Sequence, residues 1–360
     1  MSYPIDINTL TAEQFAALPL VIKGESKEVR YAGNGLVVIK FLPTVYSFTS
    51  NRCATVPGSD IPRLRCSREF VKVLATAGIE HAYKEVNDQW VLAHLVMPHD
   101  VEFAKYGLPR FVPPDLTAVQ IAALPVAPPI EIVIKKFLTG TTKHSCCGLA
   151  GSRVRASHRF YAGMPLAADG ALPEMIVRFD WRNPLKNEVQ LARILKQTET
   201  QGLPTFIRRI CELLYGSTQD TFIAIMSGFP PIQEKFRQLL AFAGRDVFGL
   251  DRMPDTALPE QLADLFIDVQ AARRTAFLAG RAIERFLADR NIVFYDLCLF
   301  ISEDGKLVYG EISPDCGRYR HTDLGMLDKD VWRAGGSSDD VFQKWMQLAT
   351  MITSKPTKES

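Results

Sequence analysis

The sequence has no CxxC motif and no long apolar run. Seven cysteines are scattered along 360 residues without a CxxC pair, a pattern that is typical of reduced thiols and not of a disulfide framework. No apolar run reaches the roughly 18 residues that a membrane-spanning helix needs. The start, MSYPIDINTL, lacks the basic and apolar parts of a secretory signal. We therefore expect a cytoplasmic protein without a membrane partner.

An excess of charge of one sign is also lacking. Lysine and arginine number 42 against 40 acids, which leaves a net charge of +2. This balance gives no general attraction for nucleic acid, so we expect small-molecule substrates and no nucleic-acid partner. The hydrophobic fraction of 47% is enough for a large core, and the length predicts two or three lobes. The oligomeric state stays open, with a homo-oligomer among the options.

Three common catalytic signatures are missing as well. The sequence contains no Walker A pattern GxxxxGK[ST], no GxSxG and no HExxH. A nucleotide site, if present, must therefore be built differently from a P-loop.

The pattern of apolar residues predicts an α+β protein. The stretch 11–18 predicts a short helix with Thr11 as its N-cap, and AGNG predicts a hairpin within 21–41. The other expected elements are, in order, a helix over 67–79, strands in QWVLAHLVM and IEIVIKKFL, a Pro-rich connector over 107–130, a loop over 142–175, mostly helix over 190–257, a long helix after Pro259, a hairpin over 292–312 and a final helix over 339–352. This order favours an α+β enzyme with a cleft between lobes.

The stretch KGESKEVRY can cover phosphate groups. Gly24 and Ser26 offer backbone N–H groups in a hairpin, and Lys27 offers an ammonium. Taken alone, an ordinary charged hairpin is the favoured interpretation.

A second candidate is IEIVIKKFLTGTTKH. Glu131 and Lys135 are four residues apart on a strand and therefore share a face, and Gly140 with Thr141 can offer an N–H and a hydroxyl to a phosphate. The alternative is a strand with charges on its solvent face. In VRFDWRNPLKNE, Asp180 can contact a ligand or belong to a simple turn.

The stretch YGEISPDCGRYR, 309–320, together with Asp296 upstream of it, carries the acids of a fourth candidate. Asp296, Glu311 and Asp315 offer oxygen ligands of the kind that Mg²⁺ prefers, and Arg318 can grip a phosphate or carboxylate with its fork. Scattered surface charges are the alternative.

Taken in order, these stretches resemble the SAICAR synthetases, which use ATP to join aspartate to a carboxyaminoimidazole ribonucleotide. The matching stretches run over about residues 20–350, and they are GESKEVRY, EIVIKKFLTGT, NPLKNE, DLCLFIS, GEISPDCGR and DKDVWR. EISPD together with DKDVWR is the most specific part. The resemblance implies an antiparallel β lobe that binds ATP over 1–130 and an α/β lobe over 131–360. The mostly helical segment at about 190–257 is longer than in the family, and we interpret part of it as a helical insertion in the second lobe.

The resemblance also implies ATP and Mg²⁺ as cofactors and a role for each matching residue. Catalytic roles fall to Lys27, Glu311 and Asp315, and metal binding to Asp296, Glu311 and Asp315. ATP binding falls to Gly24, Ser26, Lys27, Lys40, Arg178 and Asp296. Binding of the carboxylate and amino-acid substrates falls to Glu131, Lys135, Gly140, Thr141, Arg318, Lys329 and Arg333.

Departures from the family pattern indicate a diverged paralogue. Lysine replaces an arginine at 135, and glycine replaces an acid at 310. The other departures are Glu25 for lysine, PGSD over 57–60 for a G-K-G loop, Asn183 for aspartate, and Cys298 and Phe300 for the Lys and Glu of D-F-K-L-E. Several of the lost groups touch ATP or metal in the family, and their loss is expected to weaken or move a metal.

The functional hypothesis is an ATP-dependent amide ligase. It would join an amino acid, with aspartate expected, to a carboxylated nitrogen heterocycle or its ribosyl phosphate, in a specialised nucleoside or natural-product pathway. The alternatives are a housekeeping SAICAR synthetase, a small-molecule kinase and a non-catalytic nucleotide-binding protein.

Overall fold

The structure is a computed structural model. It describes residues 5–47, 52–99, 103, 108–137, 139, 160–161, 164–165, 170–181, 257–258, 263–264 and 266–354. Gly140, Thr141 and Asn183 lie outside these residues, as does almost all of the predicted helical insertion.

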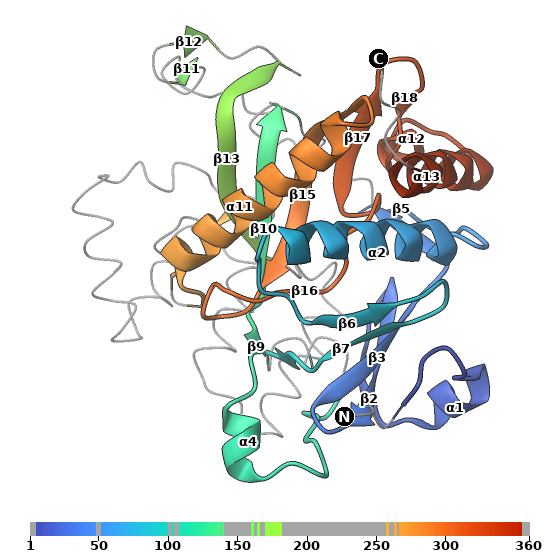
Figure 1. Cartoon of the computed structure of the whole chain (residues 1–360), viewed down its shortest axis with the longest axis vertical. Helices are drawn as coiled ribbons and strands as arrows, with labels where there is room; N and C mark the ends of the chain where they lie inside the picture. The colour runs from blue at the N-terminus through green and yellow to red at the C-terminus, as the bar shows by residue number, and fades with distance from the viewer. Residues whose placement is uncertain are drawn as a thin grey trace.

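The first half of the chain builds a five-stranded antiparallel sheet (Figure 1). Its strands, in spatial order, are β1 (Leu20–Lys23), β2 (Lys27–Gly33), β3 (Leu36–Phe41), β7 (Val91–His94) and β6 (Tyr83–Val86). Asn34 and Gly35 turn the chain between β2 and β3 with φ of 53° and 71°, the left-handed conformation that a tight hairpin needs. The predicted AGNG hairpin is thus confirmed.

Short elements surround this sheet. Helix α1 (Ala12–Ala17) has the predicted N-cap, since Thr11 accepts a hydrogen bond from the Gln14 amide and Gln14 caps Thr11 in return. The small pairs are β4 (Thr44–Ser47) with β5 (Arg52–Thr55), and β8 (Met97–Pro98) with β9 (Val126–Ala127).

The second sheet is also antiparallel and comes from the later part of the chain. Its spatial order is β14 (Ala257–Leu258), β13 (Ala171–Trp181), β10 (Ile130–Phe137), β15 (Ile292–Ile301), β17 (Gly317–His321) and β18 (Gly325–Met326), with β16 (Val308–Tyr309) paired to β15. A separate pair is formed by β11 (Phe160–Tyr161) and β12 (Met164–Pro165).

Helix α11 (Val269–Ala288) covers one face of the second sheet (Figure 1). Asp268 caps its first turn by accepting from the Ala271 amide. The helix approaches closely at Gly280, where an added Cβ would lie 2.7 Å from Met175 Sδ and 2.9 Å from Ile134 Cγ2. The opposite face of the sheet is therefore the one left for a site.

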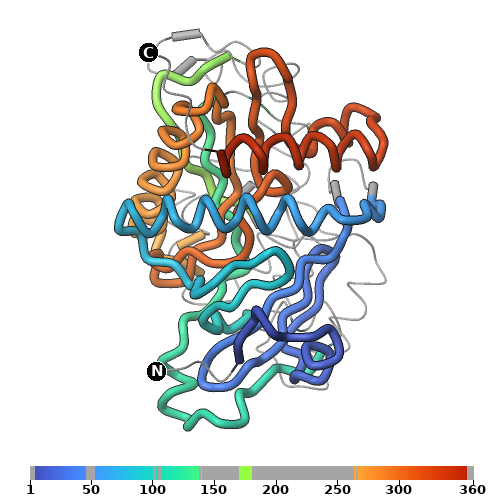
Figure 2. The backbone as a smooth tube through the Cα atoms, turned by 45° about the vertical axis from the view of Figure 1, so that its right-hand side comes forward, coloured from blue at the N-terminus to red at the C-terminus, as the bar shows by residue number. Residues whose placement is uncertain are grey.

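Helix α2 (Asp60–Thr76) lies between the first sheet and α13 (Ser338–Thr353), as Figure 2 shows in blue and dark red. One continuous cluster of buried apolar side chains runs from Val21 in the first sheet to Ile352 in α13. Because the two sheets share this core, the core does not mark a boundary between two lobes. The predicted division at residue 130 therefore stays a prediction.

Four boundaries differ from the prediction. The long helix that was expected directly after Pro259 begins at Val269, where Asp268 caps it. Helix α2 begins at Asp60, seven residues before the expected start, because Pro62 is tolerated in a first turn, where its missing N–H has no partner to lose. The Pro-rich connector contains a short helix, α4 (Ala118–Ala122), held by a capping box at Thr117. The expected loop over 142–175 contains the start of β13. No described helix is long and apolar enough to cross a membrane.

Candidate functional site

The face of the second sheet away from α11 carries polar side chains. On β10, Ile130, Ile132 and Ile134 are fully buried, and Glu131 and Lys135 alternate to the other face. Residues directly opposite each other on neighbouring strands share a face. Asp180 lies opposite Glu131, and Arg178 opposite Val133. The predicted common face of Glu131 and Lys135 is therefore confirmed.

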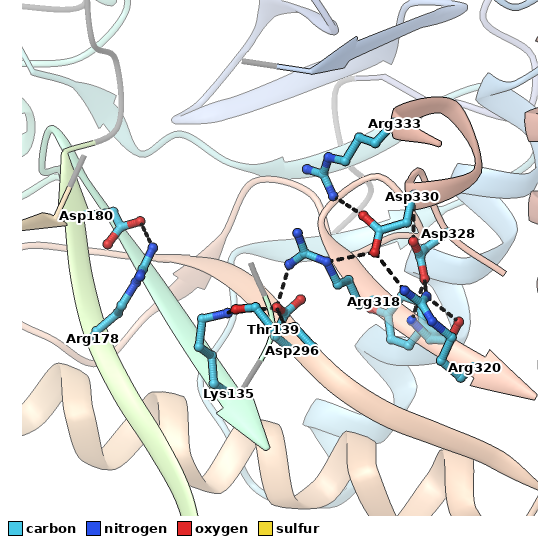
Figure 3. A network of polar contacts seen from close by, with 11 residues as sticks. Lys135, Thr139, Arg178, Asp180, Asp296, Arg318, Arg320, Asp328, Asp330 and Arg333 are labelled. Carbon is cyan, nitrogen blue, oxygen red and sulfur yellow. Dashed lines mark hydrogen bonds and ion pairs between the residues drawn. The ribbon is translucent and has the colours of Figure 1, made fainter. Parts of the chain in front are cut away.

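Asp296 is the centre of a network on this face (Figure 3). It lies opposite Lys135 on one side and Arg318 on the other. Asp296 Oδ2 accepts three hydrogen bonds: from Lys135 Nζ at 3.0 Å, from Arg318 Nη1 at 2.5 Å and from Thr139 Oγ1 at 3.0 Å. Lys135 and Arg318, both predicted to bind substrate, are thus brought together on one carboxylate.

The network continues into α12 (Asp330–Arg333). Asp330 accepts from Arg318 Nε at 2.9 Å, Arg320 Nη2 at 2.6 Å and Arg333 Nη1 at 2.6 Å. The fully buried Asp328 accepts from Arg320 and from the Tyr319 amide. We call the following residues the Asp296 network: Lys135, Thr139, Asp296, Arg318, Arg320, Asp328, Asp330 and Arg333.

Charge pairing sets the ionisation of these acids. Burial alone would raise the pKa of Asp296, but Arg318 and Lys135 outweigh burial and hold it well below its usual range. Asp328 behaves differently, because burial and the nearby Asp330 raise its pKa to about 6 against the pull of Arg320. The network thus contains one carboxylate that titrates near neutral pH.

A second cluster gathers around Glu311, at the junction of the two halves of the chain. Arg63 from α2 donates from Nε to Glu311 Oε1 and from Nη2 to Oε2, both at 2.7 Å. Lys27 Nζ from β2 donates to Oε2 at 2.8 Å, and Ser313 Oγ to Oε1 at 2.5 Å. Two protein donors therefore serve each oxygen of Glu311.

Asp315 and Lys329 complete this cluster. Lys329 Nζ lies 3.3 Å from Asp315 Oδ1. One carboxylate oxygen of Asp315, one of Glu311 and Cys316 Sγ lie within 4.8 Å of one another, so these three residues could approach one ion. We call Lys27, Arg63, Glu311, Ser313, Asp315 and Lys329 the Glu311 cluster. It adjoins the Asp296 network, since Lys329 and Asp330 are neighbours in the chain.

The Glu311 cluster lies in a buried environment. Burial by itself would raise the pKa of Glu311, but Arg63 and then Lys27 hold it well below its ordinary value. Burial raises the pKa of the Cys316 thiol to about 12, with Glu311 adding to the effect. Cys316 is therefore a neutral thiol in this setting, and a metal would have to displace its proton.

The structure does not unite all of the predicted residues. Lys40 lies opposite Glu28 on the outer face of the first sheet, with its Nζ 5.9 Å from the centroid of the Trp90 ring. Lys27 lies opposite Phe41 on the inner face, so Lys27 and Lys40, both predicted to bind ATP, lie on opposite faces of the sheet.

The predicted metal ligands are likewise divided. Glu311 and Asp315 belong to one cluster, whereas Asp296 is the centre of the other.

The other predicted residues surround these two clusters. Ser26 O accepts from the Leu42 amide and Arg63, which holds the β1–β2 turn over the Glu311 cluster, and the Gly24 amide donates within that turn. Arg178 pairs with Asp180 at 2.6 Å on β13. Their binding roles stay predictions.

Two positions where the resemblance implies acids are filled by an apolar contact. Phe300 is 7% exposed and packs against Gly310, where an added Cβ would lie 2.5 Å from the Phe300 ring. Gly310 also has a φ of +89°, which disfavours any side chain. Neither position has a side chain that could bind a metal.

Arg63 is the main site residue that the sequence reasoning missed. Phe70, Ser67 and Arg63 follow one another at helical spacing, and all three are buried on α2. Extending the apolar stripe of the predicted helix upstream from Phe70 would have placed an arginine in the core. A buried guanidinium requires an acidic partner, so this pattern was a readable signal.

Comparison with known proteins identifies sequence and structural relatives. No protein-family model matches the chain. The Bifunctional cordycepin biosynthesis cluster protein 3 of Cordyceps militaris is 26% identical over 372 aligned positions, which cover 96% of this chain and 34% of that protein. The chain thus spans about a third of the length of this curated relative.

Solved structures match the whole chain. A type-2 SAICAR synthetase in complex with ADP has a TM-score of 0.51 at 14% identity, and covers 94% of this chain and 100% of its own. The phosphoribosylaminoimidazole-succinocarboxamide synthase of Ehrlichia chaffeensis has a TM-score of 0.52 at 13% identity, with the same coverage. The SAICAR synthase of Saccharomyces cerevisiae, complexed with SAICAR, has a TM-score of 0.51 at 10% identity and covers 98% and 100%. The chain therefore has the α+β fold of the SAICAR synthetases, as the resemblance in the sequence implied.

Proposed function

We propose that this chain is an ATP-dependent ligase that forms an amide from a carboxylate and an amine. The proposed substrates are a carboxylated nitrogen heterocycle, or its ribosyl phosphate, and an amino acid, with aspartate as the first candidate. Structural relatives were solved with ADP and with SAICAR. The sequence relative is named for a cordycepin biosynthesis cluster, which supports a specialised natural-product pathway.

The observation that carries the proposal is an excess of cations over acids in each of two adjoining clusters. The Glu311 cluster holds three cations against two carboxylates, and the Asp296 network holds four against three. Each cluster thus has a surplus positive charge before any ligand binds. Such adjoining clusters favour a ligand with several phosphate and carboxylate groups.

The chemistry needs a leaving group better than oxide. An oxygen of the substrate carboxylate attacks the γ-phosphorus of ATP, the bond from that phosphorus to the bridging oxygen breaks, and ADP leaves. The amine nitrogen then attacks the acyl carbon of the resulting acyl phosphate. The carbon–oxygen bond to phosphate breaks, inorganic phosphate leaves, and the nitrogen gives up a proton. Positioning and charge neutralisation are the main contributions that a protein makes to such phosphoryl transfer.

The residues of the two clusters suit these steps. Lys27 lies under the β1–β2 turn and would neutralise phosphoryl oxygens. Lys135 and Arg318 would hold the substrate phosphate, and Lys329 and Arg333 the carboxylates of the amino acid. Each of these cations is paired with an acid here, so ligand binding requires an exchange of partners.

The test is a turnover assay read by mass spectrometry. Protein, Mg-ATP and aspartate are mixed with a panel of heterocyclic carboxylates that includes carboxyaminoimidazole ribonucleotide. The expected product is one carboxylate plus aspartate minus water, formed with one ADP per amide. Lys135→Met should lose most of this activity, whereas Lys72→Met, at an exposed lysine that pairs with Glu69 on α2, should keep it.

The other outcomes separate the alternatives. A stable phosphorylated product that forms without the amine identifies a kinase. Product from carboxyaminoimidazole ribonucleotide alone, at ordinary rates, identifies a housekeeping SAICAR synthetase. Nucleotide binding without turnover of any acid in the panel would contradict the ligase for these substrates and favour the non-catalytic alternative.

A further inference from the structure

We infer that Arg63 is the resident counter-ion of Glu311, so that the Glu311 cluster binds ligand phosphates directly through its lysines and not through a divalent ion held by the protein. This inference rests on the proposed function for the identity of the ligand, a nucleotide. It departs from what the fold family implies, namely a metal ion held by acids at this place.

Protein hydrogen-bond donors already saturate the carboxylate of Glu311. A carboxylate has about four acceptor positions, and Arg63 fills two of them while Lys27 and Ser313 fill the other two. Both side chains of the Arg63–Glu311 pair are 0% exposed. Arginine does not give up its proton in proteins, so a metal on Glu311 would leave a buried guanidinium without its partner.

Arg63 is also anchored independently of Glu311. Its Nη1 donates to the Leu42 carbonyl at 2.7 Å, and its Nη2 reaches the Ser26 carbonyl at 3.3 Å. These two nitrogens therefore have partners other than Glu311, whereas Nε donates to Glu311. The side chain cannot swing away to admit an ion without breaking its bonds to these two carbonyls.

The acids that would bind a metal together with Glu311 are missing. Phe300 and Gly310 stand where the SAICAR synthetases have acids. Here they form one close contact, because a side chain at 310 would overlap the Phe300 ring. The two changes fit each other sterically. An acid restored at 310 alone would have no room.

The Glu311 cluster carries a net positive charge. Lys27, Arg63 and Lys329 outnumber Glu311 and Asp315, so a bare divalent ion would enter a region that is already net positive. A phosphate chain would instead be attracted. A lysine ammonium is a compact point charge that serves this purpose well, and Lys27 is the cation of the cluster that lies beneath the β1–β2 turn.

The experiment measures metal and nucleotide binding separately on the full chain. Mn²⁺ alone is titrated into the wild type and into Glu311→Gln, with free Mn²⁺ followed by electron paramagnetic resonance. ADP is titrated by calorimetry in EDTA and in Mg²⁺, with Lys27→Met as the test variant. The matched control is Arg65→Met, because Arg65 lies on the same helix and pairs with Asp88 at the surface.

We expect Mn²⁺ binding that does not differ between the wild type and Glu311→Gln. We also expect ADP affinity in EDTA within about fivefold of that in Mg²⁺, and a loss of about tenfold or more in Lys27→Met but not in Arg65→Met. A Mn²⁺ site that disappears in Glu311→Gln would overturn the inference, as would a loss of ADP affinity of about fivefold or more in EDTA.

The failure of the proposed function gives a different result. If ADP binds under neither condition, the nucleotide part of that function is refuted. The comparison of Mn²⁺ binding between the wild type and Glu311→Gln still decides whether the protein holds an ion through Glu311.

Discussion

Replacing Arg63 with methionine should destabilise the protein far more than an ordinary surface substitution. Methionine keeps much of the apolar stem but removes the guanidinium. Glu311 is then left fully buried with only Lys27 and Ser313 as donors, and the Leu42 carbonyl loses the bond from Arg63. Breaking a buried pair from one side costs about 3–5 kcal/mol, because the remaining charge stays buried without full compensation.

Arg65→Met provides the comparison on the same helix. Arg65 and Asp88 are 36% and 44% exposed, and their pair is accessible to water. An exposed pair of this kind contributes about 0–1 kcal/mol. Each variant replaces an arginine of α2 with methionine, and the two arginines differ mainly in burial. The difference between the two losses in unfolding free energy therefore measures the contribution of the buried Arg63–Glu311 pair.

The assay is equilibrium unfolding in urea, followed by tryptophan fluorescence and by circular dichroism. Coincident transitions from the two probes are needed before the midpoints are converted into free energies. The double variant Arg63→Met/Glu311→Leu should be less destabilised than the sum of the two single variants, because it leaves no unpaired charge from this pair. Equal midpoints for Arg63→Met and Arg65→Met would refute the argument that Arg63 joins the two halves through Glu311.

Three further substitutions test local features by the same urea assay. Gly280→Ala should destabilise the fold although alanine is the better helix former by about 1 kcal/mol, because the new Cβ would overlap Ile134; a gain in stability would contradict that close approach. Gly310→Ala should cost about 1–3 kcal/mol from its positive φ and its overlap with Phe300, and an unchanged midpoint would show that the contact is absent. For Asp328→Asn the test is pH dependence. The raised pKa of Asp328, about 6, means that the folded wild type takes up a proton that the unfolded chain does not hold between about pH 4 and 6. Wild-type stability relative to the variant should therefore fall as pH rises through this window and then level off, and a constant difference between pH 4 and 8 would show that Asp328 does not titrate there.

Much of the fold was readable from the sequence because its signals are local. The AGNG turn, the Thr11 cap and the apolar period of α11 each act within a few residues, and each predicted element is present. The start of α2 was missed, because the helix was predicted only from residue 67, although a first turn accepts Pro62.

The candidate site was harder to predict because its partners are distant in the chain. Arg63 and Glu311 are 248 residues apart, and no local pattern joins them. Strand alternation correctly placed Glu131 and Lys135 together. The same rule, applied across the β2–β3 hairpin, separates Lys40 from Lys27. Register was the missing information. The turn pairs Gly33 with Leu36, but an irregularity between Tyr31 and Gly33 shifts the pairing by one residue, so the turn geometry alone would not have supplied it.

The effect of each departure from the family pattern can be judged only once its neighbours in the structure are known. From the sequence, Gly310 and Phe300 are two losses of charge. In the structure they are one apolar contact beside Tyr309, whose ring centroid lies 5.9 Å from that of Phe300. A site that had simply lost acids would be expected to leave Glu311, one of the acids that remain, partly unpaired and exposed. Glu311 instead has two donors on each oxygen, which is the arrangement that the inference of Arg63 as its counter-ion requires.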